Sequence, residues 1–305
     1  MFVYLDNDIA YLLGMIIGRG IIAEKEGRWI ITIEFPFIKP ELEGHNQFAG
    51  FVTSIVAHTL PRVKSLLGEA VDLSVVQEKM VRFTISLPTT HIVVRNFKQI
   101  LGENLDYSKF AIPTVIENAP EEIVREFVRG FADVAGNIRR SNRDQSGFHR
   151  VFLDVLSINW TLPVQMCNLL QTKLQVPVNH ILWGHPNLRD PTAKEKSPAW
   201  REHQIRIYAH DFLKVGFYIE HKQAVLKILA KENQKLGGKK RSSFCKGYSY
   251  RRLRKKANHP AENDERLPEF LQGKHFDAYW QICASCGCNS AIVALKNLQQ
   301  KKRLI

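Results

Sequence analysis

Apolar residues recur along the chain with two alternating periods, which predict helices and paired strands in a fixed order. Residues 8–20 form an apolar run of helical length around Gly14, and residues 126–137 repeat this layout around Gly130. Glycine costs about 1 kcal/mol relative to alanine inside a helix. The usual reason to keep it there is the close approach of another backbone. The two segments are therefore predicted to be helices that pack together at a central seam.

Each predicted seam helix is followed by the same series of elements. Residues 28–37 and 80–87 alternate between apolar and polar positions, the period-two pattern of strands in a half-solvated sheet. The series of helix, two strands, helix, two strands and helix occurs in residues 1–110 and again in residues 120–235. We therefore predict an α+β fold built from two tandem α-β-β-α-β-β-α repeats.

The expected elements can be assigned to residue ranges. Thr89 or Thr90 is expected to cap the helix that follows it, because a hydroxyl can accept from the first free N–H groups. The expected helices cover residues 8–20, 41–67, 89–101, 120–134, 162–174, 210–217 and 222–233, and the expected strands cover residues 20–24, 28–37, 71–78, 80–87, 136–142, 149–157, 178–184 and 202–208.

Composition narrows the class of partner. The chain has 305 residues, of which 45% are hydrophobic, so it can bury a sizeable core. Its formal net charge of +13 favours a polyanionic partner, either nucleic acid or an acidic membrane surface. The apolar run at residues 9–17 is too short to span a bilayer, and the N-terminal segment lacks the basic start of a secretory signal. We therefore expect an intracellular, cytoplasmic monomer without a membrane partner.

The last quarter of the chain differs in composition. Residues 246–256 are strongly basic and include Tyr248 and Tyr250, a combination that suits phosphate contact and base stacking. Cys283 and Cys286 have the spacing of half a zinc site. We predict a small helical module over residues 242–305, with helices at 267–280 and 291–298. Its expected zinc ligands are Cys245, His259, Cys283 and Cys286, with His275 and Cys288 as competitors; the alternative is reduced thiols without metal.

Two nine-residue segments in the predicted seam helices carry a family resemblance. Residues 12–20 read LLGMIIGRG, and residues 128–136 read VRGFADVAG. Both resemble the signature of the single-chain LAGLIDADG homing endonucleases, and residues 215–217 with Lys222 resemble the closing segment of such a domain. The resemblance implies that the signature helices pack at a pseudo-twofold axis and that two four-stranded sheets form a saddle in the DNA major groove. Double-stranded DNA is then the expected partner.

Polar side chains on the predicted strands are the candidates for reading DNA. The major groove admits a two-stranded ribbon and presents a distinct donor and acceptor pattern for each base pair. The strands also carry Thr32, Glu34, Thr84, Ser86, Asn142, His149 and His203. The basic residues expected to bind DNA are Arg19, Arg28, Arg82, Arg139, Arg140, Arg143, Arg150, Arg201, Arg206, Lys222, Arg251, Arg252 and Arg254.

The two signature segments lack the acids that cleavage by this family requires. The resemblance implies a carboxylate just before the final glycine of each motif, and the pair holds a divalent metal such as magnesium. Arg19 and Ala135 occupy these positions. Asp133 lies two residues earlier, and two residues turn a helix by about 200°. Asp133 should therefore face away from the usual site, at a position where the family often has a structural acid.

We accordingly predict sequence-specific binding of double-stranded DNA without cleavage by the family mechanism, with Arg19 at a central phosphate. One alternative is an active, magnesium-dependent, site-specific endonuclease with displaced acids, for which Asp133 is the candidate catalytic residue. In that case the remaining acids could also come from a separate nuclease or another protein subunit. A second alternative is an RNA-binding splicing helper on the same scaffold.

Overall fold

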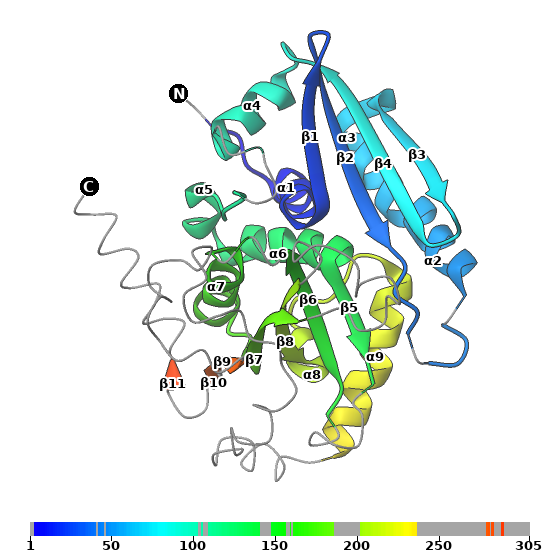
Figure 1. The fold of residues 1–305 in the computed structure, drawn as a ribbon, viewed down its shortest axis with the longest axis vertical. Coiled ribbons are helices and arrows are strands. Elements are labelled where there is room, and N and C mark those ends of the chain that lie inside the picture. The colour runs from blue at the N-terminus through cyan, green and yellow to red at the C-terminus, as the bar shows by residue number, and fades with distance from the viewer. Residues whose placement is uncertain are drawn as a thin grey trace, which may run out of the picture.

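The computed structural model places two antiparallel sheets, of four and five strands, on either side of a central pair of helices (Figure 1). This arrangement confirms the predicted α+β class. Only the backbone is described for residues 180, 182–185, 279–280, 282–283 and 288–289. The structure otherwise describes residues 3–40, 42–45, 47–102, 105, 109–140, 148–156, 159, 161–179, 181 and 202–236.

Two helices form the central seam, α1 (Asn7–Arg19) and α6 (Glu121–Ala135). Helix α1 begins after Asp6, whose carboxylate accepts from the N–H groups of Asp8 and Ile9, as is usual for an N-cap. The two helices lie side by side in the middle of the molecule (Figure 1). Both seam helices were therefore predicted correctly to within two residues.

Gly14 and Gly130 allow the two helix backbones to approach each other closely. A Cβ atom added at Gly14 would lie 2.8 Å from the backbone nitrogen of Phe131, and one added at Gly130 would lie 2.9 Å from the carbonyl carbon of Tyr11. Real Cβ atoms do not come this close to a main chain, so neither position accepts alanine without a shift of the helices. Farther along, Gly18 of α1 faces Val134 of α6, which shows that the helices run in the same direction.

The first sheet follows α1 directly and has the strand order β1-β2-β4-β3. Its inner face packs against helices and buries large side chains, among them Trp29, Phe35 and Phe83. Because successive side chains on a strand point to opposite faces, the residues between them lie on an open face. The strands are β1 (Gly20–Lys25), β2 (Arg28–Pro36), β3 (Val71–Val76) and β4 (Met80–Pro88).

The second sheet follows α6 directly and has the order β5-β6-β8-β7-β9. Its first four strands therefore repeat the order of the first sheet. The fifth strand, at residues 279–280, pairs with β7, so the predicted helix over 267–280 is wrong at its last two residues. The free edge of β7 supplies the backbone partners that a helix would have made internally. The strands are β5 (Gly136–Arg139), β6 (Arg150–Leu156), β7 (His180–His185), β8 (Glu202–Tyr208) and β9 (Tyr279–Trp280).

The helix predicted over residues 41–67 begins only at Phe48 and contains a π-helical turn at Ile55–Thr59. Pro40 and Gly44, which has a positive φ of 79°, keep the segment before it out of the helix. The π turn precedes Pro61, whose missing N–H would otherwise break a regular α-helical ladder. The elements are α2 (Phe48–Ser54), the π turn, α3 (Leu60–Leu67) and a 3₁₀ turn (Gly68–Ala70).

The other helices follow the prediction with local differences. His91, not Thr89 or Thr90, caps α4, because its Nδ1 accepts from the N–H of Val93. The helix predicted over 210–217 ends at Phe212, before Gly216 adopts a positive φ of 69°. The helices are α4 (Ile92–Leu101), α5 (Thr114–Glu117), α7 (Thr161–Asn168) with a π turn (Leu169–Lys173), α8 (Ala209–Phe212) and α9 (Glu220–Lys235).

Only short strands are described in the predicted C-terminal module. β10 (Ile282–Cys283) and β11 (Cys288–Asn289) form an antiparallel pair in which Cys283 and Cys288 are cross-strand partners in the backbone register. The helix predicted over 291–298 lies outside the described residues.

Candidate nucleic-acid interface

The two signature segments end at the same end of the seam. Strand β1 starts at Gly20, immediately after Arg19, and β5 starts at Gly136, immediately after Ala135. Both glycines are extended, and each donates its N–H back to the last turn of its helix. A Cβ at Gly20 would lie 2.7 Å from Cα of Ile16, so the switch from helix to strand has no room for a side chain there. Each sheet therefore starts where a seam helix ends.

Arg19 forms an ion pair across the molecule with Glu202 at the start of β8. The Nη2 and Oε1 atoms are 3.1 Å apart, and the two side chains are 25% and 20% exposed. Ala135, at the corresponding position of α6, is buried. A guanidinium and a methyl group supply no oxygen ligand to a magnesium ion, which binds through carboxylates and water. In the described part of the chain, no group of three or more His, Cys, Asp or Glu side chains is placed to hold a metal.

Asp133 is fully buried and connects α6 to α1. Its Oδ2 accepts from the hydroxyl of Tyr11 at 2.6 Å and from the N–H of Tyr218, while its Oδ1 accepts from the N–H of Ile219. Loss of solvation raises the pKa of this carboxyl to about 6, although Tyr11, Lys222 and the two N–H groups oppose the shift. These contacts agree with the structural role expected for this acid and leave its oxygens occupied.

Arg62 extends this buried connection from α3. Its guanidinium lies over the rings of Tyr11 and Tyr218, at 4.1 and 4.6 Å from their centroids, and pairs with Asp8 and Glu126 at 2.8 Å. One cation thus contacts both seam helices and the segment before α9. The seam is consequently held by polar contacts at its edge as well as by close packing along it.

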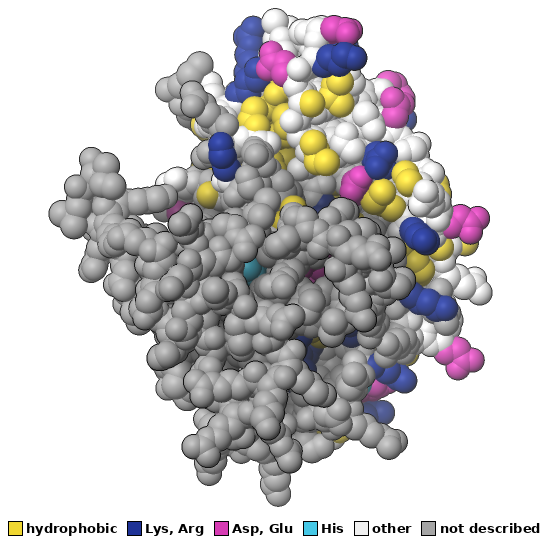
Figure 2. Space-filling model, in the orientation of Figure 1, with side chains coloured by type: hydrophobic (Ala, Val, Ile, Leu, Met, Phe, Trp, Pro, Cys, Tyr) yellow, Lys and Arg dark blue, Asp and Glu magenta, His cyan; other side chains and the backbone are white. Residues whose placement is uncertain are grey.

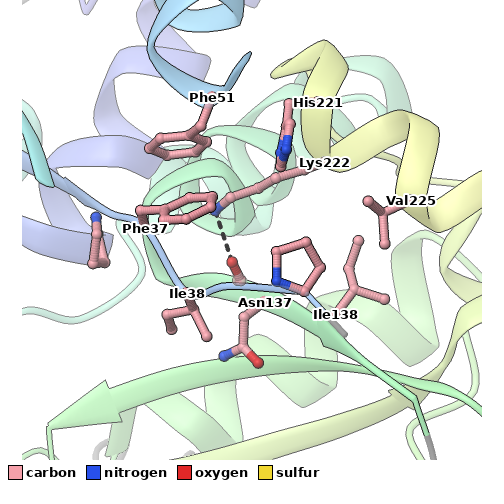
Figure 3. Close-up of a pocket in the computed structure, with 11 residues that line it drawn as sticks. Phe37, Ile38, Phe51, Asn137, Ile138, His221, Lys222 and Val225 are labelled. Atoms are coloured by element: carbon pink, nitrogen blue, oxygen red, sulfur yellow. Dashed lines mark hydrogen bonds between the residues drawn. The ribbon is translucent and has the colours of Figure 1, made fainter. Parts of the chain in front are cut away.

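Lys222 was predicted to bind DNA, but its ammonium points inward and caps α6. Nζ donates to the carbonyl oxygens of Asp133 and Gly136 at 2.6 and 2.7 Å, acceptors that the end of the helix leaves without an intrahelical partner. The faces of Phe51 and Phe217 flank it. Figure 3 shows the side chain in a small pocket between β5, α9 and the segment after β2. Loss of solvation lowers the pKa of Lys222 to about 8.

A second buried carboxylate, Asp154, organises the face of the second sheet that carries the predicted readers. Its Oδ2 accepts from the amide of Asn137 at 2.7 Å, and its Oδ1 accepts from the amide of Gln204 at 3.0 Å. The amide oxygens of these residues in turn accept from Arg139 and Arg206, at 3.0 and 3.1 Å. One carboxylate thereby orients two guanidiniums through two amides. Loss of solvation and the neighbouring Glu202 raise the pKa of Asp154 to about 7.

Phe152 lies between the two guanidiniums at the outer end of this network. The guanidinium carbons of Arg139 and Arg206 lie 5.3 and 5.0 Å from the centre of its ring. Arg150 lies beside them on the same face and is buried over the ring of Tyr208. Three predicted DNA contacts are thus brought together on one face, two of them half-buried and one buried.

The open face of the first sheet carries the predicted readers of β2 and β4. Arg28 donates to the hydroxyl and carbonyl oxygens of Ser86, both at 2.8 Å, and Arg82 pairs with Glu34 at 2.8 Å. Ile21 on β1 is 59% exposed on this face. Figure 2 shows apolar side chains over this part of the molecule with lysines and arginines around them.

Three other predicted contacts lie elsewhere. Arg140 pairs with Glu232 of α9 at 3.1 Å, and His149 contacts the same carboxylate at 2.8 Å. His203 is a cross-strand partner of the buried Val155, so it faces the core and not the open face. Asn142, Arg143, Arg201, Arg251, Arg252 and Arg254 lie outside the described residues, as do Cys245, His259, His275 and Cys286; for Cys283 and Cys288 only the backbone is described.

Sequence reasoning missed the residues that complete the network. Asn137, Phe152, Gln204 and Glu202 were not among the candidates, although the alternation along β5, β6 and β8 puts them on the same face as the predicted arginines. That alternation was the available signal. It was obscured because Phe152 is apolar and because this face, unlike that of the first sheet, is largely buried.

Comparison with solved structures finds distant structural likenesses to LAGLIDADG proteins. A variant of I-DmoI in complex with its target DNA has a TM-score of 0.37 and 15% identity, over 68% of this chain and 90% of that one. I-WcaI bound to its DNA recognition sequence has a TM-score of 0.42 and 12% identity, over 75% of this chain and 88% of that one. The N-terminal LAGLIDADG domain of WhiA has a TM-score of 0.38 and 14% identity, over 70% of this chain and 80% of that one.

No protein-family model matches the sequence, and no curated protein matches it significantly. None of the helices in the described ranges is long and apolar enough to cross a membrane.

Proposed function

We propose that the protein binds double-stranded DNA sequence-specifically and does not cleave it through a pair of metal-holding carboxylates. The observation that carries this proposal is the placement of two sheets with the same order of four strands. Each sheet starts where a close-packed seam helix ends and carries candidate readers on the corresponding face. Together the sheets form a pseudo-twofold saddle. Duplex DNA has the same local symmetry, so such a protein can contact two half-sites at once.

The dimensions of the sheets and the net charge of the chain suit a DNA duplex. Strands β2 and β4 have nine residues each, which gives a length of about 30 Å. A pair of antiparallel strands fits the major groove, where every base pair has a distinct pattern of donors and acceptors. The net charge of +13 provides the general attraction to phosphates.

The proposed loss of cleavage rests on Arg19 and Ala135. Metal-assisted attack on a phosphodiester needs carboxylate oxygens to hold the ion beside the scissile bond. At this place the protein has a cation paired with Glu202 and a buried methyl group. Asp133 is no substitute, because Tyr11 and two backbone N–H groups occupy its oxygens.

The proposal is tested by selecting duplexes from a randomised pool with the intact protein and then measuring binding and cleavage separately. We expect a defined duplex to be enriched, its affinity to fall steeply with salt, and supercoiled plasmid carrying it to stay intact with magnesium. Structured RNA should compete poorly. Enrichment of no sequence, or tighter binding of the RNA, would overturn the proposal of DNA recognition.

The alternative, an active endonuclease with displaced acids, is favoured by one observation. Glu34 on β2 and Asp154 on β6 stand one residue after the partners of Gly20 and Gly136, so they occupy equivalent positions near the two motif ends. Both carboxylates already have partners, Arg82 in one case and two amides in the other. Magnesium-dependent nicking at a defined site that disappears in Glu34→Gln and Asp154→Asn would establish this alternative.

A further inference from the structure

We propose that Arg139 and Arg206 of the second sheet read guanines in one half of the DNA target. The positions of the first sheet that match them in register, Ala23 and Thr84, contact thymines in the other half. This inference rests on the proposed function and specifies its substrate. It follows from the different side chains that the two sheets place at equivalent positions of one shared register.

The register defines which positions correspond. Gly20 pairs with Ile33 in the first sheet, and Gly136 pairs with Leu153 in the second. Counting from these pairs, Ala23 corresponds to Arg139 and Thr32 corresponds to Phe152. Thr32 is the partner of Thr84, and Phe152 is the partner of Arg206. The trio Arg139, Phe152 and Arg206 is therefore matched in the first sheet by Ala23, Thr32 and Thr84.

The trio of the second sheet suits guanine. Arginine recognises the O6 and N7 acceptors of guanine with two parallel donors, the commonest specific contact in the major groove. The two guanidinium carbons lie at most about 10 Å apart, the sum of their distances to the Phe152 ring. Base pairs are spaced by about 3.4 Å, so the two guanines should lie within about three steps of each other.

The hydrogen bonds from Asp154 through its two amide partners fix the direction in which the guanidiniums of Arg139 and Arg206 point. An ionised carboxylate only accepts hydrogen bonds, so the amides of Asn137 and Gln204 must turn their NH₂ groups towards Asp154. Their oxygens then face Arg139 and Arg206. Asp154 is consequently a positioning residue for both readers.

The matching positions of the first sheet suit thymine. Alanine and the methyl group of threonine are the side chains that contact the thymine methyl in the major groove, and they offer guanine no pair of donors. Ile21, which corresponds to Asn137, adds an apolar side chain that is 59% exposed. Figure 2 shows apolar side chains over the first sheet. The two halves of the target should therefore differ in composition.

The test is selection of bound duplexes from a randomised pool, followed by competition with single-base variants. Wild-type protein should enrich duplexes with two nearby guanines in one half and thymines in the other. Arg139→Met and Arg206→Met should each reduce discrimination at one guanine by about tenfold to hundredfold and leave the preference for the thymine half. Arg206→Lys keeps the charge but lacks the planar fork, so it should reduce the discrimination less than Arg206→Met does.

Two further variants separate positioning from folding and from charge. Asp154→Asn presents an NH₂ group to one amide, which must then flip and release its arginine. It should weaken discrimination at the guanines, even though the loss of a negative charge strengthens the general attraction to phosphates. Arg125→Met, which removes a partly exposed arginine paired with Glu121 near the start of α6, is the matched control and should preserve discrimination.

The outcomes distinguish this inference from the proposed function. Palindromic enriched sites would overturn the asymmetric target, as would guanine discrimination that survives both Arg139→Met and Arg206→Met, and in either case DNA binding itself would stand. If no duplex is enriched by the wild-type protein, the proposed function fails and the inference fails with it.

Discussion

Gly14 and Gly130 occupy equivalent positions of α1 and α6, and each lies against the main chain of the other helix. Gly14 meets the backbone of Phe127 and Phe131, and Gly130 meets the backbone of Tyr11. This reciprocal contact sets the distance between the helices and hence between the two sheets that start at their ends.

The first prediction concerns this contact. Gly14→Ala or Gly130→Ala should lower the free energy of unfolding by about 1–3 kcal/mol, because the added methyl group overlaps a main chain that cannot give way. Gly50→Ala is the control, since a Cβ there meets only His221 at 3.7 Å and alanine favours the helix. Urea titration measures all three. Equal effects at Gly14 and Gly50 would contradict the close approach.

The second prediction concerns the buried carboxyl of Asp133. Its pKa of about 6 exceeds the ordinary value of 3.8, so folding favours the neutral form. The associated stability is fully present below about pH 4 and is lost as the pH rises through 6, a change of roughly 3 kcal/mol. Asp133→Asn cannot ionise. The stability difference between wild type and this variant should therefore shift in favour of the variant between pH 4 and 7.5, as measured by urea titration; a constant difference would refute the prediction.

The third prediction concerns the position of the missing acids. Arg19→Asp combined with Ala135→Asp should create a carboxylate pair at the foot of the seam. Added magnesium should then raise the unfolding temperature of the double variant, because an ion that binds only the folded state stabilises it. The wild type should not respond, since Arg19 places a cation there. A similar magnesium response in both proteins would show that metal binds elsewhere.

The fourth prediction concerns pH and sequence discrimination. Asp154, with a pKa of about 7, faces Glu202, Arg19, Arg139 and Lys222 as well as its two amide partners. Protonation makes one oxygen a donor and should flip one amide, as Asp154→Asn does. Guanine discrimination should thus be stronger at pH 8 than at pH 6 in the wild type and independent of pH in the variant. Competition binding at both pH values measures it.

The fifth prediction concerns zinc, which the spacing of Cys283 and Cys286 favours. Purified protein should contain about one zinc ion per chain by elemental analysis. Cys286→Ser should lower the zinc content, while Cys167→Ser, at a buried thiol of α7, should not. A zinc content that is unchanged in Cys286→Ser would exclude this thiol as a ligand.

Much of the fold could be predicted because its signals are local. The two glycine-centred helices and the alternating strands β2 and β4 are each encoded by neighbouring residues, and their ends were placed within one or two positions. The capping of α4 by His91 and the π turn before Pro61 were missed, because competing local signals differ there by small energies.

The order of the elements, the close-packed seam and the lack of acids at both motif ends follow from the sequence, since they depend on residue type and spacing along one chain. The pairing of Arg19 with Glu202, the capping of α6 by Lys222 and the orientation of two arginines by Asp154 became evident only from the folded chain. These contacts join residues on separate elements, and in the first two pairs the partners lie more than 80 positions apart. Their energies depend on burial and on the partners that folding brings together.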